Sequence, residues 1–347
     1  MNVLDSVWLE QSKKDKIIKE IILTADFETA YYTVCKYITC RSLQPLHASI
    51  IHNVSDNQAS MDLAPRGHGK STIGDVDFCI TKVLRNPDIR ILIGSKTQTQ
   101  ASAFLKEIRT HFEQNVNLIR IFGDWKKSRD NVWNDKEFTV NRRTVIKKEA
   151  TVSALGASGA VVSKHFDIII GDDLVGFENA RTEAQRKVLK EWFYSSLYPT
   201  LEPDGEIHIL GTRYSPMDLY EDLIKSKNYK VNVQQAITVK DGQEYSLWES
   251  KFSLEKLRSI REEAGLIIFN MQYQNNTELA KGKIFKYKYF KHFEEYDIDY
   301  DLNRVRVKVL DSQGVPYWIP VRIYMGADLA ISEDETSNND YFVLTVI

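Results

Sequence analysis

Residues 64–72 read Ala64-Pro65-Arg66-Gly67-His68-Gly69-Lys70-Ser71-Thr72. An apolar run over 61–64 leads into this glycine-rich stretch, and a helical pattern over 71–84 follows it. Strand, loop and helix in this order are typical of a phosphate-binding loop, in which backbone N–H groups and the positive end of the helix surround phosphate. Ala64 stands where the usual pattern has its first glycine. The stretch predicts a P-loop that binds ATP.

The polar side chains of the loop have the chemistry that ATP requires. Lys70 is expected to reach the β and γ phosphates, and the Ser71 hydroxyl to bind Mg²⁺. The remaining positions, 65–69 and Thr72, are expected to bind nucleotide with the loop backbone. The predicted cofactors are therefore ATP and Mg²⁺.

A pair of carboxylates follows the apolar run 166–171. Parallel strands deliver ligand-binding residues at their carboxyl ends, which would bring Asp172 and Asp173 to the P-loop. From their order we expect Asp172 to hold Mg²⁺ and Asp173 to orient or deprotonate the attacking water. The opposite assignment of the two roles stays open.

A third strand end, after the apolar run 206–211, carries Thr212 and Arg213. Thr212 is expected to sense the γ-phosphate and to transmit its loss. For Arg213, a structural ion pair and a phosphate contact are equally compatible with the sequence.

Short apolar runs alternate with amphipathic stretches between residues 59 and 280. This alternation predicts an α/β fold with a mostly parallel central sheet flanked by helices, as in the ASCE type of P-loop NTPase. Residues 1–58 read as a helical region, because apolar residues recur at helical spacing over 16–23 and 30–38. The expected strands of the core, 59–280, are 60–64, 89–94, 150–155, 166–171, 206–211 and 230–237, and its helices include 97–112 and 182–194.

The pattern changes in residues 281–347, which we expect to be a linker and the first strands of an incomplete second domain. A hairpin is predicted from the runs 305–309 and 316–323, with a turn at 312–314. Two further buried strands are predicted over 322–329 and 341–347.

The bulk composition is that of an ordinary globular protein, with 43% hydrophobic residues and a formal net charge of -2. That charge excludes a protein that coats nucleic acid through bulk charge. No apolar run or leader supports a membrane or secreted location, so an intracellular protein is expected. The three cysteines (Cys35, Cys40 and Cys79) lack the spacing of a zinc site or a disulfide framework.

Local basic clusters are either DNA contacts or ordinary solvated faces. The third of them is interleaved with the aromatic residues Phe285, Tyr287, Tyr289 and Phe290. The clusters are Lys126, Lys127 and Arg129; Arg142, Arg143, Lys147 and Lys148; and Lys281, Lys283, Lys286, Lys288 and Lys291.

The altered loop at 64–72, the Asp172-Asp173 pair and the strand end at 211–214 occur in the order found in the terminase large subunits of tailed bacteriophages, and the sequence resembles that family. The resemblance extends from about Arg41 to residue 347. It implies an ATPase domain that drives double-stranded DNA into a procapsid, followed by a nuclease domain of RNase H type.

The same resemblance implies roles for single residues. Arg66 matches an arginine implicated in hydrolysis, Thr212 matches the coupling motif, and Arg41 with Gln44 matches an adenine-binding pair. Asp328 matches the first metal ligand of the nuclease, which uses Mg²⁺ or Mn²⁺. Since the other ligands of that family lie beyond residue 347, this chain is expected not to cut DNA. The trans-acting arginine is not assigned among Arg129, Arg142, Arg143 and Arg181.

The partners implied by the resemblance are double-stranded DNA, the portal protein of the procapsid, the small terminase subunit and further copies of the chain in a ring, with a pentamer as the family's form. In isolation a monomer is equally compatible with the sequence. The implied location is the host cytoplasm, with transient docking on the procapsid.

Two other functions remain open at this stage. A helicase-like P-loop ATPase would act on single strands and unwind a forked duplex without a portal. A hydrolysis-deficient ATP-binding assembly factor would bind nucleotide only, and the presence of both Asp172 and Asp173 argues against it.

Overall fold

The computed structural model describes residues 3–126, 132–157, 159, 164–278, 298–301, 304–310, 314–321, 325–328 and 343–346. The chain divides into two compact units, Met1–Gly282 and Lys283–Ile347. The division falls close to the expected start of the second domain, whose RNase H character stays a prediction.

A seven-stranded sheet forms the centre of the first unit, in the order β3-β4-β2-β5-β6-β1-β7. Every neighbouring pair is parallel except β3 with β4 at one edge. One strand, β6, lies between the strand that precedes the P-loop and the strand that ends in the acidic pair. The strands are β1 Ala59–Leu63, β2 Ile91–Ser95, β3 Glu137–Phe138, β4 Val152–Gly156, β5 Phe166–Asp172, β6 Leu201–Gly211 and β7 Lys230–Val233.

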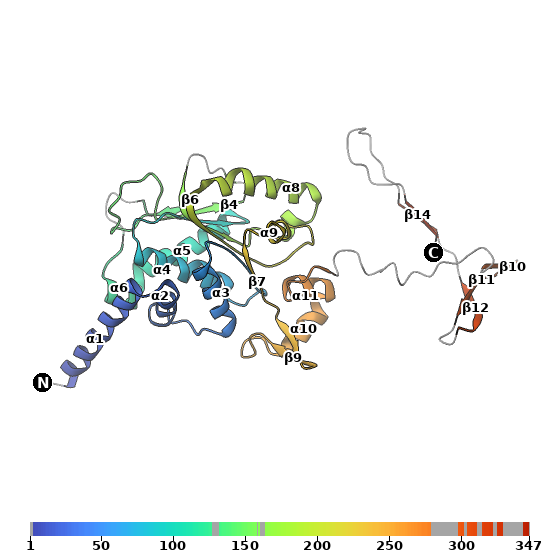
Figure 1. The fold of residues 1–347 in the computed structure, drawn as a ribbon, viewed down its shortest axis with the longest axis horizontal. Coiled ribbons are helices and arrows are strands. Elements are labelled where there is room, and N and C mark those ends of the chain that lie inside the picture. Colours follow the sequence, from blue (N-terminus) through green and yellow to red (C-terminus); the bar gives the residue numbers. More distant parts are fainter. Residues whose placement is uncertain are drawn as a thin grey trace. The chain divides into compact units, whose positions relative to one another are not determined.

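Helices cover both faces of this sheet (Figure 1). On one face lie α2 to α6, and on the other lie α8 and α9. The predicted mostly parallel sheet flanked by helices is confirmed. These helices are α2 Phe27–Thr33, α3 Pro45–Asp56, α4 Phe78–Arg85, α5 Gln98–Gln114, α6 Val116–Phe122, α7 Phe177–Ala180, α8 Glu183–Trp192 and α9 Leu219–Ser226.

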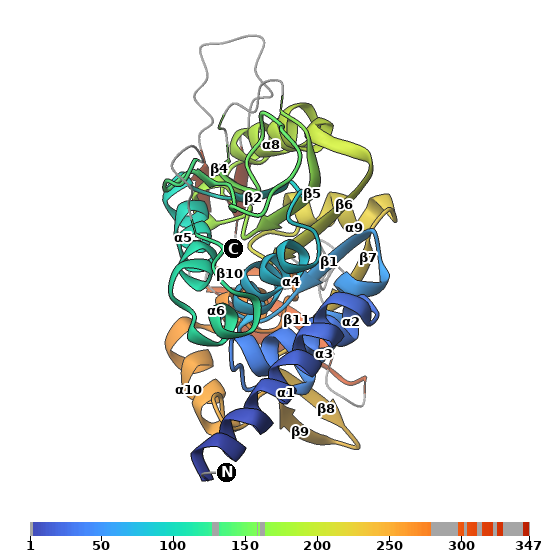
Figure 2. The same ribbon diagram turned by 90° about the vertical axis from the view of Figure 1, so that its left-hand side faces the viewer.

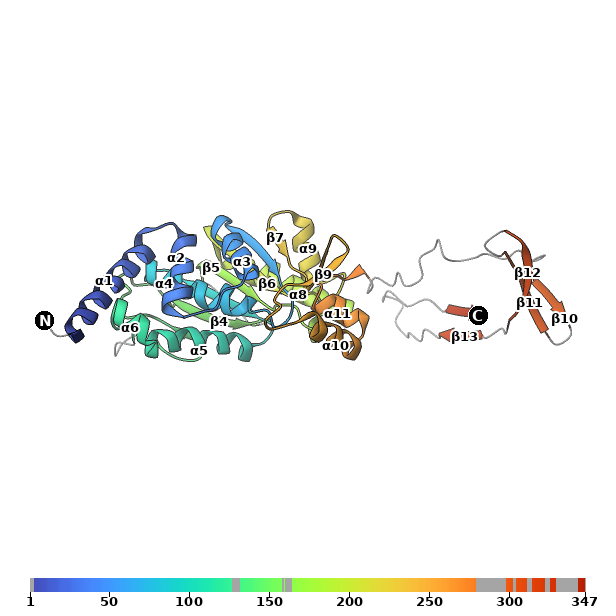
Figure 3. The same ribbon diagram turned by 90° about the horizontal axis from the view of Figure 1, so that it is seen from below.

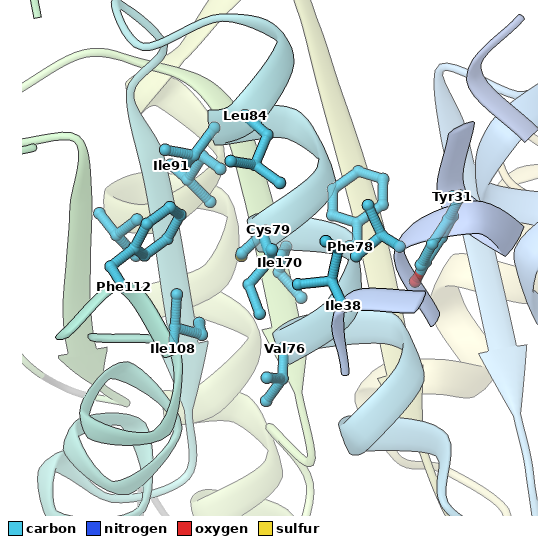
Figure 4. Close-up of a cluster of buried hydrophobic side chains, with 14 of the residues drawn as sticks. Tyr31, Ile38, Val76, Phe78, Cys79, Leu84, Ile91, Ile108, Phe112 and Ile170 are labelled. Atoms are coloured by element: carbon cyan, nitrogen blue, oxygen red, sulfur yellow. The ribbon is translucent and has the colours of Figure 1, made fainter. Parts of the chain in front are cut away.

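Strand β5 shows how the sheet builds two cores. Side chains alternate between the faces of a strand, so Ile168 and Ile170 enter one cluster and Ile169 enters the other. Figure 4 shows the first cluster, where Ile170 lies among side chains from helices α4 and α5. A strand buried on both faces reads as the continuous apolar run seen in the sequence.

The N-terminal helix α1 Val3–Thr24 contacts α2, α4 and α6, and its first turns extend away from the rest of the unit (Figures 1 and 2). Among the described residues, no helix combines the length and the apolar character that crossing a membrane requires.

Wide helical turns of the π type follow α2 and precede α4. The π-helical turns η1 Val34–Ile38 and η2 Thr72–Asp77 continue directly into or out of neighbouring α-helices, and η3 Phe193–Leu197 with the 3₁₀ turn η4 Tyr198–Thr200 extends α8. The predicted helix over 71–84 is therefore η2 followed by α4.

A smaller group of elements ends the first unit. The hairpin β8 Ile237–Lys240 and β9 Gln243–Ser246 is followed by α10 Leu254–Ala264 and α11 Leu266–Gln272. Their core contains Ala236, Leu257 and Phe269. Figure 3 shows α10 and α11 at the end of the unit opposite to α1. The single strand predicted over 230–237 is wrong, because β7 ends at Val233 and β8 belongs to a separate sheet.

The second unit contains two small antiparallel sheets. The predicted hairpin is present as β11 Arg304–Leu310 paired with β12 Pro316–Val321, and β10 Ile298–Asp301 adds a third strand. Strands β13 Met325–Asp328 and β14 Val343–Val346 pair with each other, within the two runs predicted as buried strands.

Candidate functional site

The backbone of the P-loop depends on two glycines. Gly67 and Gly69 have φ angles of +78° and +79°, which favour residues without a Cβ. A Cβ on Gly69 would also lie 2.9 Å from His47 Nε2. The His47 ring is fixed there because its Nε2 lies 3.0 Å from the His68 carbonyl oxygen and its Nδ1 accepts from the Gln44 N–H. The loop therefore wraps closely over the start of α3.

Lys70 meets both acidic residues at the carboxyl edge of the sheet. Its Nζ lies 2.9 Å from Asp173 Oδ2 and 4.0 Å from Asp172 Oδ1. Burial alone would lower the pKa of Lys70, but the charges of Asp173 and Asp172 outweigh it and hold that pKa above the ordinary value. The lysine is therefore a fixed cation.

Strand β6 connects this acidic pair to the P-loop. The Asp173 N–H donates to the Leu210 carbonyl oxygen at 2.9 Å, and Asp173 takes a φ of 45° after β5 ends. The Thr212 hydroxyl, at the end of β6, donates to the Ala64 carbonyl oxygen at 3.2 Å. Thr212 thus links the end of β6 to Ala64, the first residue of the loop.

A third carboxylate, which was not predicted from the sequence, belongs to the same cluster. Asp75 lies in η2, one turn after Ser71, and is fully buried. Its pKa is raised well above the ordinary value by burial and by Asp172.

Asp172 has the environment of a metal ligand. Burial raises its pKa to about 6, although Lys70 opposes the shift. Among the described residues, neither Asp172 oxygen accepts a hydrogen bond of ordinary geometry, and the Ser71 hydroxyl and Asp75 are its polar neighbours besides Lys70 and Asp173. Buried carboxylate and hydroxyl oxygens without donors fit a hard divalent cation such as Mg²⁺.

The segment after β9 packs against the outside of the P-loop. The Phe252 ring stacks on His68, with centroids 4.5 Å apart and planes 7° from parallel. Lys251 Nζ donates to the Gly67 carbonyl oxygen at 2.8 Å. The Arg66 N–H donates to the Gln272 carbonyl oxygen at 3.0 Å. Residues from 251–272 therefore hold three consecutive positions of the loop.

Arg66 is exposed toward Gln272, and its guanidinium Nη1 donates to Gln272 Oε1 at 3.1 Å. Pro65 receives the His68 N–H on its carbonyl oxygen at 3.2 Å, which closes the tight turn of the loop. Thr72 begins η2, and the Ile73 N–H donates to the Gly69 carbonyl oxygen at 3.2 Å.

Arg41 and Gln44, predicted from the resemblance to bind adenine, have structural contacts here. The Arg41 guanidinium lies 3.1 Å from buried Asp77 and 3.3 Å from Glu107. Gln44 caps the N-terminus of α3. Arg213 also makes ion pairs, at 3.3 Å from Asp218 and 2.8 Å from Glu221. Of the two roles considered for Arg213, an ion pair and a phosphate contact, the structure shows the ion pair.

The candidates for a trans-acting arginine differ in their surroundings. Arg142 lies over the Trp125 ring and donates to the Asp124 carbonyl oxygen, and Arg143 Nη1 donates to the Glu149 carbonyl oxygen. Arg181 is exposed and lies over the Phe177 ring, 5.8 Å from its centroid.

Several predicted residues lie outside the described residues: Lys127, Arg129 and the whole cluster Lys281, Lys283, Lys286, Lys288 and Lys291. For Asp328 the structure gives the backbone only, where it pairs with Val343. Lys126 and Lys147 are exposed.

Comparison with family models finds no match for this chain. Among curated proteins, the terminase large subunit of Enterobacteria phage T3 is 28% identical over 270 residues, covering 68% of this chain and 44% of that protein. The chain thus spans less than half the length of this relative.

Three solved structures illustrate the structural neighbours. The large terminase ATPase domain of Thermus phage P74-26 has 14% identity and a TM-score of 0.44, covering 70% of this chain and 96% of that one. The large terminase of a thermophilic bacteriophage, solved in complex with ADP, has 11% identity and a TM-score of 0.38, covering 87% and 68%. The bacteriophage Phi-29 genome packaging motor assembly has 14% identity and a TM-score of 0.34, covering 82% and 83%. At these values the neighbours carry no argument, and the α/β fold is established by the sheet and helices described above.

The match to the phage T3 protein confirms the resemblance that the three motifs indicated: in sequence, this chain is similar to a bacteriophage terminase large subunit.

Proposed function

We propose that this chain is the motor ATPase of a bacteriophage DNA-packaging machine, which hydrolyses ATP to move double-stranded DNA into a procapsid. The observation that carries the proposal is the meeting of Lys70 with Asp173 and Asp172 across the sheet, at 2.9 and 4.0 Å. A phosphate loop, an acidic pair and a strand end that contacts the loop are the parts that phosphoryl transfer needs. The sequence match to a terminase large subunit supports double-stranded DNA as the molecule that is moved.

The position of each residue suggests its role in ATP hydrolysis. Lys70 binds the β and γ phosphates, and Arg66, at the rim of the loop, neutralises charge that develops on the γ-phosphate. Asp172 and Ser71 would hold Mg²⁺, which would neutralise part of the negative charge of the phosphates. Asp173 orients the attacking water and takes its proton. No covalent intermediate is needed.

Thr212 supplies the coupling in this proposal. Its hydroxyl reaches the Ala64 carbonyl oxygen, so a shift of the loop on phosphate loss moves the end of β6. Because β6 is hydrogen-bonded to β1 and β5, the movement is shared by the strands that carry the catalytic residues.

The assembled machine is part of the same proposal. Its partners would be DNA, the portal protein, the small terminase subunit and further copies of this chain in a ring, with a neighbour supplying an arginine. The work would take place in the host cytoplasm at the procapsid. A nuclease domain beginning with Asp328 would need Mg²⁺ or Mn²⁺ and further carboxylates.

Steady-state ATP hydrolysis with Mg²⁺ tests the assignment. Wild type is compared with Lys70→Ala and Asp173→Asn, with and without double-stranded DNA, and Lys225→Ala serves as a control because Lys225 is exposed on α9. We expect both site variants to lose a hundredfold or more, equivalent to about 2.7 kcal/mol, and the control to keep its rate. Equal rates in all four proteins would contradict the ATPase assignment.

Assembly into a ring can be tested by measuring how the hydrolysis rate depends on protein concentration. If a neighbour completes the site, the hydrolysis rate rises more steeply than linearly with protein concentration. A strictly linear dependence, together with unwinding of a forked duplex, would favour the helicase-like alternative.

A further inference from the structure

Three carboxylates and one ammonium group meet beside the P-loop. Among the described residues, the cation that lies against Asp75 and Asp172 is Lys70, whose Nζ is 2.9 Å from Asp173 and 4.0 Å from Asp172. In their ionised forms these groups leave two negative charges uncompensated. Phosphate groups would be repelled from such a cluster unless a cation lay between them.

The polar neighbour of the Asp75 carboxyl group is the carboxyl group of Asp172. Its side chain is 0% exposed, and among the described residues neither of its oxygens accepts a hydrogen bond of ordinary geometry. The same is true of both Asp172 oxygens. Buried carboxylates elsewhere in the chain have partners: Asp62 accepts from two asparagine side chains, and Asp77 pairs with Arg41. Burying acids without such partners is costly, so Asp75 and Asp172 must either share a proton or bind a cation.

The geometry of the helix explains why Asp75 reaches this place. It follows Ser71 by four residues, one turn of helix, so the two side chains lie on the same face. Gly74 lets this face approach the sheet, because a Cβ there would collide with Leu210 of β6. Asp75 therefore points at the end of β5, where Asp172 is its neighbour.

We propose that Asp75 and Asp172 together form a divalent-cation site beside the Ser71 hydroxyl, and that this site takes Mg²⁺ or Mn²⁺ before nucleotide arrives. The donors are all hard oxygens, as these ions prefer. Mg²⁺ keeps several of its waters, and Asp75 serves as a ligand or as the acceptor for a bound water. The inference extends the proposed nucleotide site at Lys70 but does not depend on hydrolysis.

Mn²⁺ titration of the full chain without nucleotide, followed by electron paramagnetic resonance, tests the site. The variants are Asp75→Asn and Asp172→Asn, which keep the side-chain shape and remove one charge. Asp62→Asn is the matched control, because Asp62 is also a buried aspartate of this unit but lies in β1 with its own amide partners. We expect wild type and the control to bind Mn²⁺, and both site variants to lose tenfold or more in affinity.

Thermal unfolding with and without Mg²⁺ adds a second readout that also checks folding. An ion that binds only the folded state raises Tm by mass action, so Mg²⁺ should raise Tm in wild type and control but not in Asp75→Asn. Unchanged Mn²⁺ affinity in a folded Asp75→Asn protein would overturn the inference, and so would a wild type that binds no Mn²⁺.

Binding of a fluorescent ATP analogue separates this inference from the proposed function. If wild type binds Mn²⁺ through Asp75 but no ATP analogue, the cation site stands and the ATPase assignment fails. If the analogue binds and Asp75→Asn binds Mn²⁺ like wild type, the ATPase assignment stands and the cation site fails.

Discussion

Lys70 Nζ lies 2.9 Å from Asp173 Oδ2, which joins the P-loop after β1 to a residue that follows β5, across the intervening strand β6. The Asp173 carboxylate is thus paired with the Lys70 ammonium group, to which the phosphates of ATP would bind in the proposed function. In the proposed function, nucleotide and Asp173 would therefore compete for Lys70, and phosphate binding would release Asp173 to orient the attacking water.

This competition predicts opposite effects of one substitution on binding and on catalysis. Asp173→Asn removes the competing charge, so ATP affinity should stay equal or rise, while the hydrolysis rate falls a hundredfold or more. Lys70→Ala should lose both. Equilibrium binding of an ATP analogue and single-turnover hydrolysis measure the two quantities separately. A tenfold loss of affinity in Asp173→Asn would show that Asp173 helps to bind nucleotide.

The two positive-φ glycines of the loop give a second prediction. Gly69→Ala places a Cβ 2.9 Å from His47 Nε2, in addition to the strain of a left-handed residue, which costs about 1–2 kcal/mol. Gly242→Ala is the matched control, because Gly242 has a φ of +77° with nothing within 4 Å of its Cβ position.

Both variants should unfold at lower temperature than wild type, and Gly69→Ala should also lose nucleotide binding. Thermal unfolding and ATP-analogue titration check the pair. Equal affinity in the two variants would mean that His47 moves aside and the loop keeps its shape.

The sequence was sufficient for the parts of the site that are local. Strand, glycine-rich loop and helix are contiguous at 59–85, and the acidic pair directly follows an apolar run, so each could be read without the fold. The order of the strands in the sheet could not be predicted in this way, because it depends on segments that lie far apart in the sequence. That β6 separates β1 from β5, and so brings Thr212 to Ala64, depends on which strands pair across the chain.

The contacts that sequence patterns could not supply come from residues far apart in the chain. Phe252 stacks on His68 although they are distant in sequence, and no periodicity links them. Asp75 sits in a helix where an isolated aspartate reads as a solvent-facing residue, and only its packing against Asp172 reveals a buried one. Arg41 matched a short motif, yet its partner Asp77 could be found only from the fold.

Arg41 gives a third prediction, on stability. Arg41→Ala leaves Asp77, which is fully buried, without its nearest cation, and breaking a buried ion pair in this way costs about 3–5 kcal/mol. The second substitution Asp77→Asn, added to Arg41→Ala, removes that charge and should recover part of the loss. Denaturant unfolding of the single and double variants measures both effects. If the double variant recovers no stability, Arg41 stabilises the fold through another contact, such as its ion pair with Glu107.

Asp62 gives a fourth prediction, on the pH dependence of stability. Its carboxyl is buried in β1, and its two oxygens accept from Asn53 at 3.0 Å and from Asn232 at 2.7 Å. Burial raises the pKa to about 7, although both amide groups oppose the shift. Between the ordinary aspartate pKa and about 7, the folded chain therefore holds a proton that the unfolded chain has released.

Since the folded state binds more protons in that window, stability falls as pH rises through it. Asp62→Asn abolishes this contribution, so its Tm relative to wild type should rise from pH 5 to pH 8. Asp77 and Asp172 also have raised pKa values, but they are present in both proteins and cancel in the difference.

Asp88→Asn is the control for Asp62→Asn, because the Thr144 hydroxyl and the Val145 N–H hold the pKa of Asp88 below its usual value. Asp88 is ionised in both states above pH 5, so its variant should differ from wild type by a constant amount between pH 5 and pH 8. Thermal unfolding of the three proteins across this range gives both differences. A flat difference for Asp62→Asn would mean that its two amide donors suffice to keep the buried carboxylate ionised.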